Sequence, residues 1–191
     1  MELNISRRNL TKVVIDKDKE TLITHSSNST SIEFSLVGVT SLICSDNCLT
    51  ELPLLPTGLK ELYCFNNQLT SLPPLPEGLE KLYCANNQLT SLPPLPKRLI
   101  TLYCANNQLT NLPPLPKRMD VLYCFDNPLK YIPFLKKRPL GLSVPKGLKK
   151  TYYSIENYQE GYRFQETNRY LFLTLFTELD LQLDFLGESY L

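Results

Sequence analysis

Several residue types that carry common chemistries are scarce in this chain of 191 residues, which has no tryptophan, one histidine and seven glycines. Lysine and arginine number 20 against 19 aspartates and glutamates, and the resulting formal charge of +1 argues against a general polyanion-binding protein. The apolar runs are far too short to cross a bilayer, and the start of the chain lacks the apolar stretch of a signal peptide. We therefore expect a cytoplasmic protein with no membrane span.

Proline is abundant instead, with 15 residues, most of which fall in one recurring motif. The segments LYCFNNQLTSLPPLPEGLEK (62–81), LYCANNQLTSLPPLPKRLIT (82–101) and LYCANNQLTNLPPLPKRMDV (102–121) repeat with a period of 20 residues. A looser copy precedes them at 42–61, and a copy with a decayed LPxLP element follows at 122–141. We expect five repeats over 42–141, between an N-terminal flank of 1–41 and a C-terminal flank of 142–191.

Each repeat predicts one short parallel strand followed by an extended return. Alternation places Leu62 and Cys64 inside the fold and Tyr63 and Phe65 outside. The LPPLP element excludes a helix, because the residue before proline leaves the α region and proline lacks an amide donor. The return should therefore run close to polyproline II. A single unit buries too little apolar surface to offset its loss of chain entropy, so the copies must stack on one another.

The unit LxxLxCxxNxLxxLPxLP is typical of leucine-rich repeats that carry cysteine at one apolar strand position. The chain resembles the shortest, 20-residue class of these repeats, which occurs with LPxLP linkers in bacterial type III secretion effectors. The string YCxNNQLTSLPxLPxxLxxL is most similar to the leucine-rich repeat proteins of giant amoebal viruses. This resemblance covers residues 42–141. It implies a curved solenoid with a concave parallel sheet that binds a protein, inside a host cell in either lineage.

Two further columns recur once per repeat. Asparagines stand where each strand ends and turns inward, where an amide side chain can satisfy backbone groups of the turn, so we interpret them as structural: Asn47, Asn67, Asn87, Asn107 and Asn127. Cysteines point inward among leucines with no histidine beside them, so we expect core thiols rather than metal ligands or disulfides: Cys44, Cys64, Cys84, Cys104 and Cys124. Cys48 lies outside this column and should be the most reactive thiol.

The outward strand positions carry an aromatic ladder where an exposed sheet normally carries polar groups. Its members are Tyr63, Tyr83, Tyr103 and Tyr123, flanked by a column of Phe65, Ala85, Ala105 and Phe125. Mutual stacking of rings about 4.8 Å apart is one explanation of the ladder. A binding hot spot on the concave face is the other, and the two are compatible. The two alanines should leave a shallow trough between the phenylalanines, suited to an extended peptide or one helix of a partner.

A basic column lies at the edge just before the strands of the later repeats: Lys97, Arg98, Lys117, Arg118, Lys137 and Arg138. Pairs at strand spacing lie within one Debye length of roughly 8 Å, so their fields add. A solvated edge that keeps the array soluble explains the column without a ligand. An acidic protein patch is the next reading, and nucleic acid is less favoured because no aromatic residues interleave with the charges.

The two flanks differ from the repeats. Residues 1–41 read as a β-rich cap, with strand-like runs at 12–15 and 32–36 and a vestige of a repeat in which Ile32, Gly38 and Val39 stand 20 residues before Leu52, Gly58 and Leu59. His25 reads as a surface-loop histidine. Leu142–Val144 is in phase for one last strand. Helical spacing of apolar residues favours a helical C-terminal cap over about 168–186, and apolar surface left over there would allow a homodimer.

These features favour a noncatalytic module that binds another protein on its concave aromatic face, and the resemblance implies that this partner belongs to a host. The alternative is an anion-binding adaptor that uses the basic edge for nucleic acid or acidic lipid. A phosphate-binding loop, a metal motif and paired carboxylates are all absent from the sequence, so we expect neither an enzyme nor a cofactor or metal.

Overall fold

The structure is a computed structural model that describes residues 1–16, 21–27, 31–130, 132–133 and 140–145. Lys137, Arg138, the helix expected over about 168–186 and the homodimer contact expected there lie outside the described residues.

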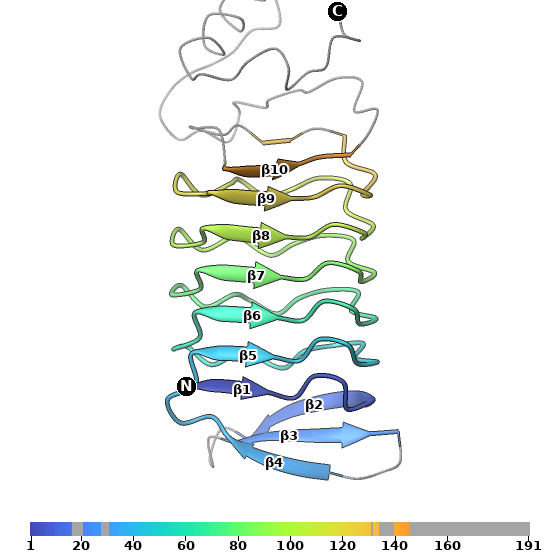
Figure 1. The fold of residues 1–191 in the computed structure, drawn as a ribbon, viewed down its shortest axis with the longest axis vertical. Coiled ribbons are helices and arrows are strands. Elements are labelled where there is room, and N and C mark those ends of the chain that lie inside the picture. Colours follow the sequence, from blue (N-terminus) through green and yellow to red (C-terminus); the bar gives the residue numbers. More distant parts are fainter. Residues whose placement is uncertain (17–20, 28–30, 131, 134–139, 146–191) are drawn as a thin grey trace, which may run out of the picture.

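The described repeats form a parallel solenoid with one strand per coil (Figure 1), as the 20-residue period predicts. Seven strands line up in the order β1-β5-β6-β7-β8-β9-β10, so that sequence order and spatial order agree from β5 onward. Their bounds are β1 Glu2–Asn4, β5 Ser41–Ile43, β6 Glu61–Tyr63, β7 Lys81–Tyr83, β8 Thr101–Tyr103, β9 Val121–Tyr123 and β10 Gly141–Ser143. The register is a strict repeat, because each leucine pairs with the leucine 20 residues later, as Leu62 pairs with Leu82.

The return of each coil contains neither helix nor strand, in agreement with the restriction that LPxLP places on the backbone. In the third coil the return covers residues 71–76, and a tight turn at Glu77 and Gly78 leads back to the sheet. Leu72 is buried, Pro74 is exposed and Leu75 packs partly against the core. The return therefore closes the back of the solenoid with every third side chain or so, and prolines shape its outer surface.

The core is a set of apolar columns that run the length of the solenoid. Leu62, Cys64, Leu69 and Leu79 are completely buried in one coil, and their counterparts in the neighbouring coils are buried in the same way. Burying one leucine side chain stabilises by about 2 kcal/mol. Because each coil contacts only its neighbours, this stabilisation depends on stacking.

Residues 1–10 build one more coil, which the sequence period does not reveal. β1 pairs in parallel with β5, with Leu3 opposite Leu42. The Ile5 amide donates to the Ile43 carbonyl at 2.7 Å, just as the Cys44 amide donates to the Tyr63 carbonyl at 2.8 Å in the next coil. The first coil thus stands 39 residues, rather than 20, before the second.

The extra length of the first coil is a three-stranded antiparallel sheet inserted in place of the LPxLP return. It consists of β2 Leu10–Asp16, β3 Thr21–Ser26 and β4 Ser31–Ser35, in that order, and Figure 1 shows it at the end of the solenoid beside β1. β2 and β4 occupy the two runs expected to be strands. β3 was not expected, because its polar residues hide an inward alternation of Leu22 and Thr24, both buried.

Two expectations about this flank are wrong. His25 lies in β3 rather than in a loop, and its Nδ1 is 2.8 Å from the Ser31 hydroxyl oxygen. Ile32 is no vestigial core position, because it lies in the edge strand β4 and is 46% exposed. Val39, by contrast, is buried at the place of Leu59. Gly38 lies in a turn as Gly58 does, but only Gly38 has a positive φ, of 69°. The described residues include no helix of the length and apolar character needed to cross a membrane.

Candidate functional site

The open face of the seven-stranded sheet carries the tyrosine ladder, with all four rings half-buried. Ring centroids are 4.6 Å apart for Tyr63 and Tyr83, 4.8 Å for Tyr83 and Tyr103, and 4.5 Å for Tyr103 and Tyr123. The angle between neighbouring ring planes grows along the ladder from 9° through 21° to 29°. The in-register parallel strands impose this stacking, because they set equivalent side chains one strand spacing apart.

An ion pair closes the N-terminal end of the ladder. Lys81 Nζ lies 2.9 Å from Glu61 Oε1, and the Tyr63 hydroxyl donates to Glu61 Oε2 at 3.2 Å. The hydrogen bond from Lys81 holds the pKa of the Glu61 carboxyl below its ordinary value, against the opposing effect of partial burial. Partial desolvation, followed by the Glu61 charge, raises the pKa of Tyr63. The pair therefore stays ionised at neutral pH and neutralises its own charge on this face.

The sheet face becomes uncharged toward its C-terminal half. Thr101, Val121 and Gly141 stand at the strand position that Glu61 and Lys81 hold in earlier coils. Gly141 makes room for the last ring, because a Cβ at that position would lie 3.2 Å from Tyr123 Oη and 3.4 Å from Tyr123 Cε2. Tyr123 lies next to this glycine, and its ring makes the widest angle of the ladder, 29° with Tyr103.

The column beside the ladder is only partly the trough that the sequence suggests. Phe65, Ala85 and Phe125 are half-buried, whereas Ala105 is only 3% exposed. Ala105 lies outside the core cluster and so belongs to the outer side of the strand, as expected. Its burial nevertheless corrects the expectation that both alanines offer open space, since a methyl group beside a bulky neighbour is easily covered. Ala85 is thus the one small side chain of this column that stays partly exposed, and we call this position the low point of the face.

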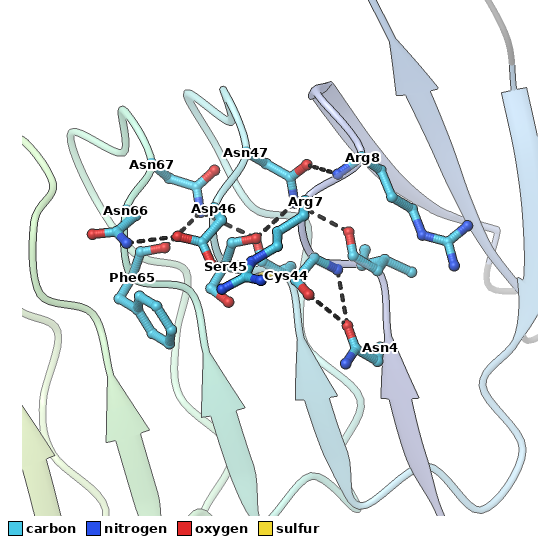
Figure 2. A network of polar contacts seen from close by, with 12 residues as sticks. Asn4, Arg7, Arg8, Cys44, Ser45, Asp46, Asn47, Phe65, Asn66 and Asn67 are labelled. Atoms are coloured by element: carbon cyan, nitrogen blue, oxygen red, sulfur yellow. Dashed lines mark hydrogen bonds and ion pairs between the residues drawn. The ribbon is translucent and has the colours of Figure 1, made fainter.

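The asparagine column fastens each coil to the coil before it, as Asn67 illustrates (Figure 2). Its side-chain oxygen accepts from the Leu49 amide of the preceding coil at 3.0 Å. Its Nδ2 donates to the Cys44 carbonyl of the preceding coil and to the Cys64 and Phe65 carbonyls of its own coil, at 3.1 to 3.3 Å. Asn87, Asn107 and Asn127 repeat these contacts. One side chain thus partners backbone groups that the inward turn would leave unpaired.

A second polar column, missed from the sequence, stands one residue earlier on the outside of the turn. Its members adopt positive φ angles of 52° to 54°: Arg7, Asp46, Asn66, Asn86, Asn106 and Asp126. Asparagine and aspartate tolerate this left-handed conformation better than most residues do. Their side chains also form a ladder, in which Asn86 Nδ2 donates to Asn66 Oδ1 at 2.7 Å and Asn66 Nδ2 donates to Asp46 Oδ1 at 2.6 Å (Figure 2). The repeated Asn-Asn pair was the sequence signal for it.

The column cysteines are all buried and unpaired. Desolvation raises the pKa of Cys44, Cys84 and Cys124 to about 12, and it raises the pKa of Cys64 and Cys104 as well. Within the described residues, no three His, Cys, Asp or Glu side chains gather in a way that could hold a metal ion. Cys48 is half-buried and donates to Asn9 Oδ1 at 3.4 Å.

The described part of the basic column consists of Lys97, Arg98, Lys117 and Arg118, all of them exposed. They occupy the tight turns that precede β8 and β9. The corresponding turns before β6 and β7 hold Thr57 with Gly58 and Glu77 with Gly78. This edge is therefore neutral to acidic in the earlier coils and basic in the later ones.

Comparison with known proteins agrees with this architecture. The family model described as "Leucine Rich repeats (2 copies)" matches residues 37–77, 57–97 and 77–117. YopM from Yersinia enterocolitica WA-314 is similar in structure, with a TM-score of 0.51 and 35% identity over 56% of this chain and 23% of that one. The leucine-rich effector protein YopM from Yersinia pestis gives a TM-score of 0.55 and 35% identity over 56% and 31%.

A Shigella effector LRR domain gives a TM-score of 0.54 and 34% identity over 72% of this chain and 52% of that one. The chain thus spans between about a quarter and about half of the length of these three structures. No curated protein matches the sequence. The repeat model, the stacked parallel coils and these neighbours together show a leucine-rich-repeat solenoid that resembles the repeat regions of bacterial effector proteins.

Proposed function

We propose that the chain is a noncatalytic module whose partner protein docks on the open face of the sheet, over the tyrosine ladder and the column from Phe65 to Phe125. The observation that carries this proposal is the stacked ladder itself. Its rings are already ordered by their neighbours, so a partner would gain aromatic contact area with little further loss of side-chain entropy. Leucine-rich-repeat proteins generally act through protein contacts, and the effector proteins among the structural neighbours support a host protein as the partner.

The chemistry of the face narrows the partner. Glu61 and Lys81 neutralise each other, and the later strands offer Thr101, Val121 and Gly141 at the same position. A matching segment would therefore be mainly apolar or uncharged and would centre on Ala85, where the column is lowest. Tyrosine hydroxyls would supply polar contacts at its rim. We place this binding in the cytoplasm, because six unpaired cysteines suit a reducing compartment.

A steric block at Ala85 tests this site. Ala85→Arg should weaken capture of the partner from host cytosol by about tenfold or more, because an arginine there would fill the low point of the face. Gln88→Arg is the matched control, since it adds the same charge in the same coil at an exposed position beyond the strand. Circular dichroism would show that both variants keep the fold. If Ala85→Arg captures the partner as well as wild type does, the open face is not the binding site.

The basic edge supports the alternative of an anion-binding adaptor for nucleic acid or acidic lipid. Four exposed cations gather on two neighbouring turns, whereas the equivalent turns of earlier coils carry none. Such binding should weaken steeply as salt rises and should be lost in the Lys97→Glu and Arg98→Glu double variant. Binding on the open face should survive both treatments, so the same two experiments separate the candidates.

A further inference from the structure

The tyrosine ladder also holds four oxidisable phenols in one continuous stack. Neighbouring rings lie face to face at centroid distances of 4.5 to 4.8 Å, over four consecutive coils. The strands are parallel and in register, with Tyr63 opposite Tyr83, Tyr83 opposite Tyr103 and Tyr103 opposite Tyr123. Equivalent atoms of neighbouring phenols therefore face one another, including the ring carbons next to the hydroxyl. These are the carbons through which two phenoxyl radicals combine.

We propose that the ladder is a site of oxidative cross-linking, at which a peroxide acting through a haem peroxidase joins two neighbouring tyrosines by a carbon–carbon bond between their rings. Each phenol gives up one electron to the peroxidase and one proton. The two radicals combine at the ortho carbons, and the two ring hydrogens at the new bond move to the oxygens as the phenols re-form. For each bond, one hydrogen peroxide is reduced to two waters, with the two phenol electrons and two protons consumed.

The N-terminal end of the ladder provides a proton acceptor for Tyr63, whereas the half-buried phenols of Tyr103 and Tyr123 would release their protons to solvent. The Tyr63 hydroxyl donates to Glu61 Oε2 at 3.2 Å, and the carboxylate is kept ionised by Lys81. A phenol that loses an electron becomes strongly acidic, so its proton can pass along this hydrogen bond to the carboxylate. Stacked neighbours then allow the electron vacancy to be shared along the ladder.

The nearest thiols are poorly placed to compete for the oxidant. Cys64, Cys84 and Cys104 lie in the same coils as the ladder but point to the opposite side of the sheet, where they are completely buried. Burial raises the pKa of each of these thiols, so they hold their protons. Cys48 is half-buried, and the change Cys48→Ser removes this thiol while keeping a donor for Asn9 Oδ1.

The geometry favours the C-terminal pair for the first bond. Tyr103 and Tyr123 have the shortest centroid distance, 4.5 Å, and the largest interplanar angle, 29°. Two rings must leave parallel stacking to join edge to edge, so the tilted pair needs the smallest further movement. Gly141 puts no side chain against Tyr123 that would hold this ring in place. Tyr63 and Tyr83, at 9°, are closest to parallel and should react last.

The test compares two variants with equal numbers of ladder phenols in the Cys48→Ser background. The variant Tyr63→Phe with Tyr83→Phe keeps the neighbouring phenols of Tyr103 and Tyr123. The variant Tyr83→Phe with Tyr123→Phe leaves ladder phenols only at Tyr63 and Tyr103, two coils apart. Phenylalanine stacks as tyrosine does, so both should fold, which circular dichroism checks. Full-length protein is treated with limiting hydrogen peroxide and a haem peroxidase, and peptides of the monomer band are mapped by mass spectrometry.

We expect wild type and the first variant to give a Tyr103–Tyr123 peptide pair lighter than its two components by two hydrogens, within a single chain. The second variant should give at least about tenfold less ladder cross-link, because the reacting rings are no longer held together. Equal yields from the two variants would overturn the proposal. So would cross-links in wild type that fall only between molecules or only at tyrosines outside the ladder. Neither result depends on the partner-binding role of the face.

Discussion

The first coil and the regular coils reach the same backbone from different sequences. Ile5 takes the buried place of a column cysteine, and Arg7 takes the left-handed turn position of Asp46 at the same φ of 54°. Arg8 stands where Asn47 stands in the next coil, yet the hydrogen bonds of the turn are intact. Asn47 Oδ1 accepts from the Arg8 amide at 3.0 Å (Figure 2). It also accepts from the Leu10 amide at 3.0 Å, and Asn47 Nδ2 donates to the Ile5 carbonyl at 3.1 Å.

This comparison shows which coil each asparagine serves. An asparagine accepts from the amide of the preceding coil, and the described residues include no coil that stacks before the first one. The first coil uses the freed position differently, and the Arg8 guanidinium lies over the Phe34 ring at 5.3 Å, between the turn and the inserted sheet. The turn of the first coil is therefore held by Asn47 of the next coil, whereas its buried apolar positions come from its own sequence.

The largest expected effect is a loss of stability at alkaline pH, to which the regular coils contribute and the first coil does not. The first coil has Ile5 where each of the next five coils buries a thiol, and three of these thiols have a pKa of about 12 against an ordinary 9.0. Because the folded state holds these protons and the unfolded state releases them, their stabilisation is complete below pH 9.0 and is lost as pH rises toward about 12. Each thiol therefore lowers the free energy of unfolding by about 1.4 kcal/mol for every pH unit in that window.

Urea unfolding at pH 8, 9.5 and 10.5 would measure this loss. Cys84→Ala should make the alkaline decline shallower, since it removes one of the thiols. An identical decline in this variant would contradict the assignment to the cysteine column.

Truncating the paired leucines sharpens the comparison between the coils. Leu102→Ala, in the middle of the solenoid, should lower the free energy of unfolding by about 3 to 5 kcal/mol, because the leucine is completely buried between two coils. Leu3→Ala, at the same register position of the first coil, should cost only about 1 to 2 kcal/mol, because Leu3 packs partly at the edge. Chemical denaturation measures both, and equal losses would show that the first coil is as tightly packed as the others.

Removing one asparagine should have the next largest effect. Asn107→Ala leaves the Leu89 amide without its acceptor. It also removes one of two donors to each of the Cys84, Cys104 and Ala105 carbonyls, and it should cost about 1 to 3 kcal/mol. Gln108→Ala is the control, because this neighbouring side chain is exposed. An unchanged melting temperature for Asn107→Ala would refute a stabilising role for the column.

The smallest effect is expected where the repeat pattern is restored in the first coil. Arg8→Asn gives this coil the missing asparagine, yet the described residues include no preceding coil whose amide it could accept from. The variant should therefore gain nothing and lose less than about 1 kcal/mol through the contact with Phe34. A clear stabilisation in thermal melts would mean that the asparagine acts mainly within its own coil.

The regular coils were predictable because each carries its own pattern. Leu62, Cys64 and Asn67 recur at fixed spacing, and their alternation and turn chemistry lead directly to a strand, a buried column and a polar turn. The first coil was not predictable, because its 39-residue spacing breaks the period. It also has Ile5 and Arg8 at the positions where the regular coils have cysteine and asparagine. β1 is recognisable only through its pairing with β5, which is a contact between segments distant in sequence.

The candidate site likewise has some features that the repeat pattern predicts and others that it does not. Stacking of Tyr63 on Tyr83 follows from register alone, and it was expected. The burial of Ala105 depends on how neighbouring side chains cover a methyl group, and the tilt of Tyr123 accompanies the room left at Gly141 in the next coil. Such details arise from packing across coils, which a pattern within one repeat does not contain.

The direction of the asparagine contacts has a consequence for how the chain is made. During synthesis the N-terminal part leaves the ribosome first. The Leu10 amide has no acceptor until Asn47 emerges, the Leu49 amide waits for Asn67, and the Leu69 amide waits for Asn87. Each of these amides gains its side-chain acceptor only from the coil translated after it, so the last coil of a nascent chain keeps an unpaired turn amide until the next coil has emerged.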